Sequence, residues 1–209
     1  MTTLSHRCIG VLFTLCCALN SQAQTSAPQN TSPESNQTTA ATEQQPGAFV
    51  RTYNDAVNTA ENLYDNGRLS IYLSGYTYHD RHTYSAAKIA TLDEKAWGFG
   101  VSKELRDAKE NEESIQLMVI TDSHYHPQVN ASYAYQWMKP IAGNWEIGAG
   151  CNAGFVSRTD IYKNVPVPGI LPMFSIGTRD TKLFMTFVPH LSGTVNGNVL
   201  YFNLRIAAK

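Results

Sequence analysis

The sequence has few charged residues and no long apolar run. Only 16% of its 209 residues are Asp, Glu, Lys or Arg, well below the roughly 25% of an ordinary soluble domain. The formal net charge is −1, so no general attraction to nucleic acid is expected. The lack of an apolar run of about 18 residues excludes an ordinary transmembrane helix. Hydrophobic residues still make up 43% of the chain and aromatic residues 11%. Together these features leave two main fold classes, a soluble β-protein and a membrane β-barrel.

The N-terminus has the features of a secretory signal. A short basic start precedes the apolar stretch 8–19, and the small-x-small triplet at 21–23 is an acceptable cleavage site. We therefore predict a signal peptide over residues 1–23. The segment 24–47 is rich in Ser, Thr, Gln and Pro and cannot bury enough apolar surface to offset the entropy of ordering. We predict a disordered periplasmic linker there.

Residues 48–66 have helical periodicity. Apolar side chains recur three and four positions apart from Phe49 to Leu63, polar side chains occupy the opposite face, and Asn66-Gly67 ends the pattern as a turn. This pattern predicts one amphipathic helix. Such a helix could lie on a membrane surface, pack beside a barrel or cover a soluble core.

After the helix the hydrophobic period changes to two, which is typical of β-strands. Runs of about ten residues with one apolar face and aromatic ends fit a transmembrane β-barrel, and an even number of strands allows closure, which removes edges that lipid would not tolerate. We therefore predict an all-β fold, an eight-stranded antiparallel transmembrane β-barrel over 67–209 preceded by the amphipathic helix. The eight runs are at 69–78, 97–104, 113–121, 128–137, 145–157, 169–177, 183–189 and 199–206.

The inner faces of the runs suggest a hollow. The third and sixth runs are apolar on both faces, although a water-filled lumen should be polar. Gly148 and Gly150 leave room on one face of the fifth run, and the alternation of the fourth run turns Ala134 inward. Because an eight-stranded barrel can enclose one small ligand, we predict that a hydrocarbon chain binds inside. The alternative is a filled structural core.

Prolines occur in or beside the sixth and seventh runs, at Pro168, Pro172 and Pro189. Proline removes a donor from the hydrogen-bond ladder, so these strands should pair incompletely with their neighbours. In a membrane barrel this predicts a lateral opening. Proline at ordinary loop ends is the alternative.

Three reactive side chains are expected at the same end of the barrel, because they follow odd-numbered strands. If the helix starts on the periplasmic side, odd-numbered strands end outside, where outer-membrane barrels have their long loops. His79 ends the first run, and Asp122 and Ser123 end the third. These residue types can move a proton from a hydroxyl and support an acyl-transfer transition state. His124 and His126 lack a third ligand at a recognised spacing, so no metal site is predicted.

At these residues the sequence resembles the PagP family of outer-membrane lipid A palmitoyltransferases. The resemblance covers about residues 48–206, and the proline segment and the last strand are its more specific parts. The matching motifs are Tyr-His at 78–79, Trp-Gly-Phe-Gly at 97–100, Asp-Ser at 122–123, the glycine-containing segment 150–154, Val-Pro-Val-Pro-Gly-Ile-Leu-Pro at 165–172 and Asn-Gly-Asn-Val-Leu-Tyr-Phe at 196–202.

The resemblance implies an acyltransferase of the Gram-negative outer membrane. It would move a palmitoyl or similar chain from the sn-1 position of a glycerophospholipid to a hydroxyl of a lipid A acyl chain, and so confer resistance to cationic antimicrobial peptides. The partners would be these two outer-membrane lipids, and no metal or nucleotide cofactor is implied. The resemblance leaves open whether the protein forms a homodimer. Two readings without catalysis also stay open, a lipid-binding barrel and a structural barrel.

Residue by residue, the family's active histidine, aspartate and serine correspond to His79, Asp122 and Ser123. On this correspondence, we expect His79 to act as the general base on the acceptor hydroxyl, Asp122 to orient it, and Ser123 to supply a hydroxyl for positioning or transition-state support. The family has a glycine at the floor of its acyl pocket, where this chain has Ala134. The additional methyl group should shorten the preferred donor chain.

Overall fold

The computed structural model describes residues 48–95, 97–158, 165–190 and 197–208. The predicted signal peptide and linker, 1–23 and 24–47, lie outside the described residues. The expected amphipathic helix is present as α2 (Ala48–Asn66). In the part of the chain that the structure describes, no helix is both long enough and apolar enough to cross a membrane.

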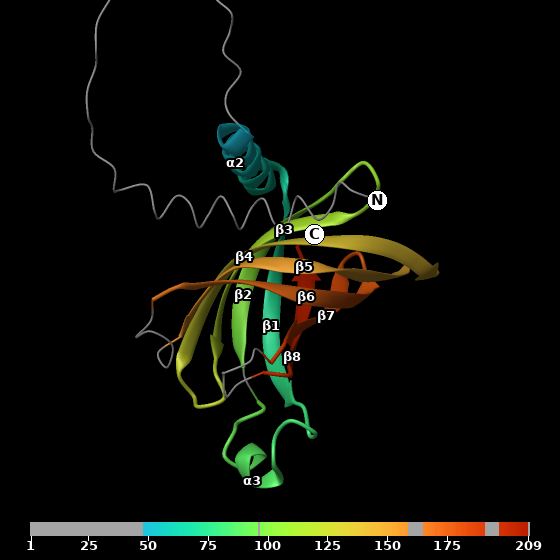
Figure 1. The fold of residues 1–209 in the computed structure, drawn as a ribbon. Helices are drawn as coiled ribbons and strands as arrows, with labels where there is room; N and C mark the ends of the chain where they lie inside the picture. The colour runs from blue at the N-terminus through green and yellow to red at the C-terminus, as the bar shows by residue number, and fades with distance from the viewer. Residues whose placement is uncertain (1–47, 96, 159–164, 191–196, 209) are drawn as a thin grey trace, which may run out of the picture.

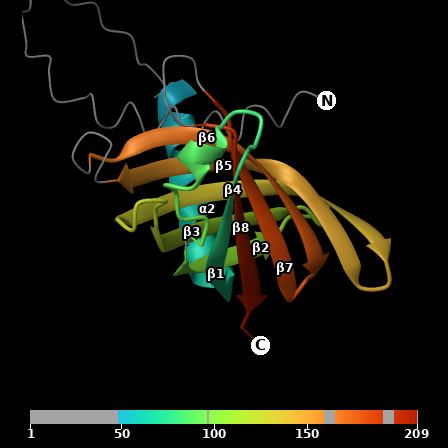
Figure 2. The same cartoon turned by 90° about the horizontal axis from the view of Figure 1, so that it is seen from below.

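Eight antiparallel strands follow α2 and close into a barrel in which each strand pairs with its sequence neighbours and β1 pairs with β8 (Figures 1 and 2). The predicted fold class is confirmed. The strands are β1 (Arg68–His79), β2 (Gly98–Arg106), β3 (Glu112–Thr121), β4 (Pro127–Ala142), β5 (Trp145–Arg158), β6 (Val167–Thr178), β7 (Thr181–Val188) and β8 (Val199–Ala207).

Most strand ends differ from the prediction by one or two residues, but β4 continues to Ala142 instead of ending at Trp137. The additional residues pair with the start of β5, and the register shifts between Pro140 and Ala142. Because proline is tolerated in a sheet where a bulge removes the need for its donor, the strand passes Pro140 and ends in the tight turn at Gly143, whose φ is +56°.

The two ends of the barrel differ. At one end, which we call the turn end, short connections join β2 to β3, β4 to β5 and β6 to β7. At the other, the loop end, the connection between β1 and β2 is long and contains the short helix α3 (Ala86–Ile89), which the sequence did not predict. Figure 1 shows α2 and α3 at opposite ends of the barrel.

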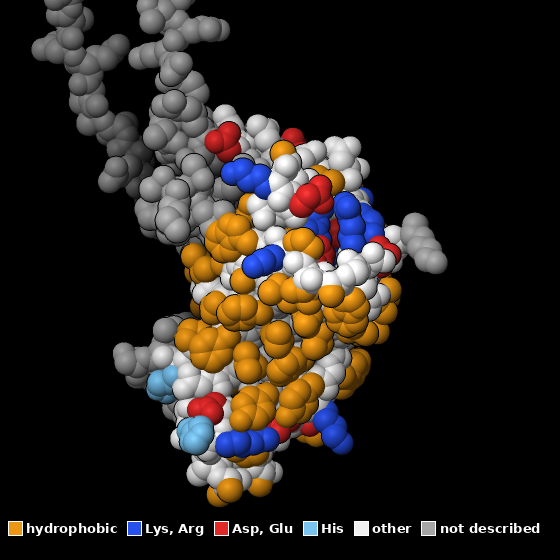
Figure 3. All heavy atoms as spheres, turned by 90° about the vertical axis from the view of Figure 1, so that its right-hand side faces the viewer, with side chains coloured by type: hydrophobic (Ala, Val, Ile, Leu, Met, Phe, Trp, Pro, Cys, Tyr) orange, Lys and Arg blue, Asp and Glu red, His pale blue; other side chains and the backbone are white. Residues whose placement is uncertain are grey.

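The outside of the barrel carries a belt of apolar side chains. Figure 3 shows this belt over the middle of one face, with most charged side chains above or below it. A belt of this kind is the surface that a membrane barrel presents to lipid. Exposed members of the belt on the eight strands include Leu69, Ile71, Leu73, Phe99, Val101, Leu117, Val119, Val129, Ile147, Ile170, Phe174, Ile176, Leu183, Leu204 and Ile206.

Helix α2 packs against the outer surface of the barrel at the turn end. Leu63 is only 1% exposed and joins a buried cluster with Tyr133 and Tyr135 on β4. The backbone N–H of Gly67 donates to the carbonyl of Leu63 (3.0 Å) and ends the helix directly before β1. The C-terminal turn of the helix therefore packs on the strands, while Tyr53 on the same apolar face is 45% exposed.

The inside of the barrel at the turn end is filled by charge. Glu112 lies at the centre, where it accepts from Arg106 (3.0 Å), Lys182 (2.6 Å) and Arg205 (2.6 Å). Lys182 and Arg205 have no exposed side-chain surface. The network closes this end of the barrel, and its members include Arg68, Glu104, Arg106, Glu112, Glu146, Lys182 and Arg205.

We expect Glu112→Gln to destabilise the barrel by about 3–5 kcal/mol, because loss of one member of a buried ion network leaves its partners without compensation. The measurement is denaturant unfolding in detergent micelles, followed by tryptophan fluorescence. Glu110→Gln is the matched control, since Glu110 is 76% exposed and surface changes usually stay within about 0.5 kcal/mol. Equal midpoints for the two variants would contradict the expected role of the network.

Candidate functional site

His79 faces the barrel interior because of a bulge in β1. Up to Ser74 the even-numbered residues of β1 point inward, and beyond it Thr77 and His79 do, since the register against β8 shifts between Ser74 and Tyr76. The residue in between is Gly75. A bulge adds one residue to a strand and reverses the faces of those that follow. His79 is consequently only 4% exposed.

His79 and Ser123 meet at the loop end. The Ser123 Oγ lies 3.2 Å from His79 Nε2, although 44 residues separate them in the chain. The ring of Tyr84 stands edge-on to the imidazole, with 5.3 Å between ring centroids. This places a hydroxyl and a potential proton acceptor in hydrogen-bond contact, which is the arrangement needed to move a proton from an alcohol.

The other imidazole nitrogen of His79 faces a residue that the sequence analysis did not identify. His79 Nδ1 lies 3.3 Å from Oε1 of Glu94, and this oxygen also accepts the backbone N–H of His79 (3.1 Å). Both carboxylate oxygens of Glu94 accept from Arg81 at 2.7 Å. Glu94 thus makes a contact of the kind that the resemblance assigned to Asp122. The one available signal was the Asp93-Glu94 pair, which lies a few residues before the second strand.

Asp122 shapes the loop that carries Ser123. It is 1% exposed, and its Oδ1 accepts the backbone N–H groups of His124 and His126, each at 2.8 Å. Its Oδ2 lies 3.7 Å from Nδ1 of His126. The loop includes Tyr125 at a φ of +65°, an uncommon conformation for a non-glycine residue. The carboxylate therefore fixes the turn in which Ser123 is presented.

His124 and His126 belong to this turn and do not gather ligands. Among the residues that the structure describes, no three His, Cys, Asp or Glu side chains form a group that could hold a metal ion.

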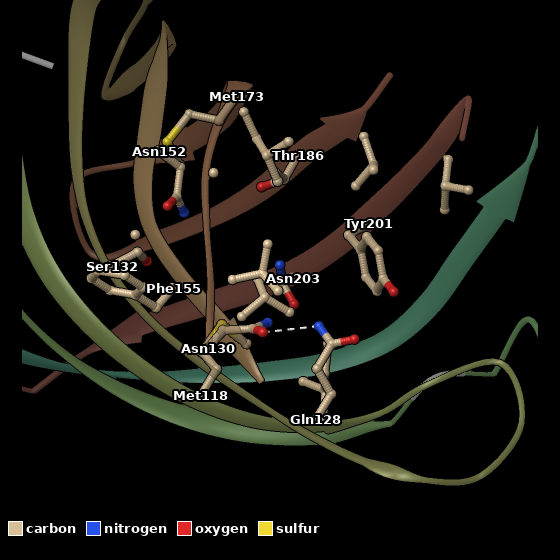
Figure 4. A pocket seen from close by; sticks show the side chains of 18 of the residues that line it. Met118, Gln128, Asn130, Ser132, Asn152, Phe155, Met173, Thr186, Tyr201 and Asn203 are labelled. Atoms are coloured by element: carbon tan, nitrogen blue, oxygen red, sulfur yellow. Dashed lines mark hydrogen bonds between the residues drawn. The ribbon is translucent and has the colours of Figure 1, made fainter. Parts of the chain in front are cut away.

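A cavity of about 350 Å³ opens beside His79 and Ser123 and occupies the loop-end half of the barrel. Its lining mixes apolar and polar side chains (Figure 4). Gln128 donates to Asn130 Oδ1 (2.9 Å) within it. The predicted hollow is present, but its lining is less apolar than the sequence suggested. Apolar members include Met118, Ile120, Leu171, Met173, Phe184, Val188 and Val199, and polar members include Gln116, Gln128, Asn130, Ser132, Asn152, Thr186 and Asn203.

The three residues assigned to the acyl pocket from the sequence are not among those that line this cavity. Ala134 is 2% exposed and packs one layer behind the lining, in a buried cluster with Met118, Met173 and Phe184. A Cβ atom on Gly148 would meet the side chains of Ser175, Met138 and Gln136, and one on Gly150 would meet the backbone of β4 at Tyr135 and Gln136. These two glycines therefore allow β4 and β5 to pack closely.

The cavity lining instead includes Gly154 on β5 and Gly169 on β6. They face each other across the β5–β6 pair. The sequence analysis thus predicted correctly which face of β5 points into the barrel. It placed the cavity at Gly148 and Gly150, whereas the cavity lies further along the strand, at Gly154.

The ladder between β6 and β7 is incomplete. Within the described ranges, their pairs run from Met173–Thr186 to Gly177–Lys182, while β6 itself begins at Val167. Pro168 and Pro172 lie in the part of β6 outside these pairs, and Pro168 also lines the cavity. Pro189 follows the last residue of β7. The predicted incomplete pairing therefore coincides with the three prolines.

Comparison with known proteins relates this chain to a family of lipid A acylation proteins. Residues 59–205 match the family described as antimicrobial peptide resistance and lipid A acylation protein PagP. The lipid A acyltransferase PagP of Bordetella pertussis is 36% identical over 146 residues, which cover 70% of this chain and 79% of the relative. Proteins of the same name from Methylobacillus flagellatus and Legionella pneumophila are each 37% identical, over 68% and 65% of this chain and 76% and 72% of the relatives.

Deletion of Gly75 should abolish lipid A acylation while the barrel still forms. Without the bulge residue, His79 would turn from the interior to the outer face. The measurement is the mass spectrum of lipid A from cells that express the variant. Gly75→Ala keeps the number of residues, and a Cβ atom there meets nothing within 4 Å, so this control should stay active. An active deletion variant would show that the bulge does not set the position of His79.

Proposed function

The chain belongs to the PagP family and is a lipid A acyltransferase, and we propose that it takes a palmitoyl or similar chain from the sn-1 position of a glycerophospholipid. The acceptor is a hydroxyl on an acyl chain of lipid A. The family links this acylation to antimicrobial peptide resistance. One observation carries the mechanism, namely that the contact between His79 Nε2 and Ser123 Oγ lies at the mouth of the 350 Å³ cavity.

In the proposed reaction, His79 acts as the general base. Its Nε2 takes the proton of the acceptor hydroxyl while the hydroxyl oxygen attacks the ester carbonyl of the donor. As the tetrahedral intermediate collapses, the lysophospholipid oxygen leaves and takes the proton back from the imidazolium. The acceptor then carries the acyl ester, and every proton is accounted for without a metal or nucleotide.

Ser123 and Asp122 support this step in different ways. The Ser123 hydroxyl lies where it can hydrogen-bond to the acceptor or to the oxygen that gains charge in the transition state. The Asp122 carboxylate holds the turn through the N–H groups of His124 and His126, and so keeps Ser123 against His79.

The donor acyl chain occupies the cavity and enters from the side of the barrel. The gap in the β6–β7 ladder, beside Pro168 and Pro172, supports this route, because strands without shared hydrogen bonds can separate at low cost. The charge network around Glu112 fills the other end of the interior. Access from the turn end is therefore unfavourable.

The proposed location is the outer membrane of a Gram-negative bacterium, reached after cleavage of the signal peptide over 1–23. The exposed apolar belt around the closed barrel supports this placement. The loop end would then face outward, where lipid A is present, with α2 on the periplasmic side.

Single replacements His79→Asn and Ser123→Ala should each lower acyl transfer by about 10²-fold or more, the usual contribution of a positioned acid–base group. The measurement is transfer from labelled phosphatidylethanolamine to lipid A in detergent micelles, with folding checked by the migration of unheated samples in SDS gels. Full activity without His79 would overturn the mechanism. A barrel that binds phospholipid but transfers nothing would favour the non-catalytic lipid-binding reading, and one that does neither would favour a structural barrel.

Within this range of donors, we expect the preferred acyl chain to be shorter than palmitoyl. Ala134 fills space behind Met118 and Phe184, so the cavity ends earlier than it would with a glycine. The side-chain amide oxygens of Gln128 and Asn203 are also buried without a hydrogen-bond partner among the described residues. A long alkyl chain beside such groups gains less than it would in an apolar bore.

Ala134→Gly should therefore shift the preference toward longer donors, since one methylene is worth about 1–3 kcal/mol of discrimination. The measurement is a competition among phosphatidylcholines of different chain length. Ala153→Gly removes the same methyl group from a buried site on the outer face of β5, so it controls for the cost of glycine in a strand. Clean palmitoyl selection by the unmodified protein would show that the length prediction is wrong.

A further inference from the structure

Between β1 and β2, the gap at the loop end of the barrel is bridged by a loop segment instead of a strand. The β1–β2 pairs end at Ser74–Gly98, yet β1 continues to His79. The Asp93-Glu94 segment takes the place of the missing partner. The N–H of Thr77 donates to the carbonyl of Glu94 (2.8 Å).

The same segment reaches the other side of the gap. The N–H of Asp93 donates to the carbonyl of Ser123 (3.0 Å), and Thr121 donates to the carbonyl of Trp97 (2.9 Å). One short piece of backbone therefore joins the strand that carries His79 to the turn that carries Ser123. Any movement of this segment would change the distance between imidazole and hydroxyl.

The Glu94 side chain adds a second connection on the histidine side. It accepts from both the backbone N–H and the ring Nδ1 of His79. Arg81 grips both carboxylate oxygens and also donates to the His79 carbonyl (3.2 Å). A bidentate guanidinium–carboxylate pair fixes both distance and orientation. His79, Arg81 and Glu94 thus form a closed set of contacts around the imidazole.

We propose that Glu94, clamped by Arg81, is the positioning residue of His79, holding the proton on Nδ1 so that Nε2 stays free to accept one. This inference rests on the proposed function and deepens it. An acceptor at Nδ1 stabilises the tautomer with hydrogen there, and the lone pair at Nε2 then points toward Ser123 and the substrate hydroxyl. The carboxylate also stabilises the imidazolium that forms when Nε2 takes the proton.

The arginine keeps this carboxylate in its working state. Hydrogen bonds from Arg81 lower the pKa of Glu94 to about 2, so Glu94 is an ionised acceptor at neutral pH. The Glu94 side chain is 19% exposed and that of Arg81 43%, so the clamp lies at the rim where it can form without burying an uncompensated charge. Glu94 contacts the imidazole and is not among the residues that line the cavity, which is why its role is positioning.

Replacement of Glu94 by Gln tests the proposal. Glutamine has nearly the same shape but can present either an oxygen or an N–H₂ group to Nδ1, so it no longer selects one tautomer. We expect kcat to fall by about 10²-fold, with KM for the phospholipid within twofold. Glu110→Gln, the same chemical change in a turn-end connection, should leave both constants unchanged.

A spectroscopic readout separates positioning from loss of structure. In ¹⁵N-histidine-labelled protein above pH 8, the imidazole shifts should report hydrogen on Nδ1 of His79 in the unmodified chain and a mixture of tautomers in Glu94→Gln. The His79 signals are assigned by their loss in His79→Asn. Arg81→Met should give a smaller loss of kcat, because Glu94 keeps its charge but loses its clamp.

The outcomes distinguish the two levels of the proposal. If His79→Asn is inactive while Glu94→Gln keeps its kcat and its tautomer, the positioning role is wrong and the proposed acyl transfer through His79 stands. If His79→Asn itself remains fully active, the proposed mechanism fails, whatever Glu94 does. Equal tautomer populations in the unmodified chain and Glu94→Gln, with a lower kcat, would mean that Glu94 acts through the fold alone.

Discussion

Closure of the backbone hydrogen-bond ladder is the constraint on which the rest of this structure depends. In a bilayer an unpaired N–H or C=O group costs several kcal/mol, so a sheet that crosses it must close. The eight strands do so, but at the loop end the ladder stops early in two seams, at Ser74–Gly98 and at Met173–Thr186. The first seam is bridged by the segment of Glu94, and the second contains prolines. Both lie beside the cavity, so the chemistry is placed where the sheet is least complete.

The interior is divided between stability and function along the barrel axis. At the turn end, Glu112 and its cationic partners fill the bore, because charges in a low-dielectric interior persist only when they are paired. At the loop end the side chains leave a cavity whose mouth carries His79 and Ser123. The filled turn end gives the cavity a floor, and a floor is what allows a barrel to distinguish one acyl chain length from another.

Much of this architecture followed from local pattern. The period of two between residues 68 and 207 predicted all eight strands, since a side chain on a barrel strand faces either lipid or the interior. Helix α2 followed from its period near 3.6. The prolines predicted the weak β6–β7 seam from the loss of a donor. The position of the cavity did not follow, because it depends on which interior side chains meet across the barrel. Along the barrel axis, Gly148 and Gly150 lie where Gln136 and its neighbours fill the interior, and Gly154 lies where the cavity is.

The sequence by itself determined the strands, the apolar belt and the gathering of His79, Asp122 and Ser123 at one rim, because these depend on periodicity and on the parity of strand ends. Only the tertiary structure decided which way His79 points and what holds it. Its direction depends on one additional residue at Gly75, which local alternation does not reveal. Its orientation depends on Glu94, fifteen residues away in a loop, and such a contact exists only once β1, the bridging segment and the turn after β3 have come together.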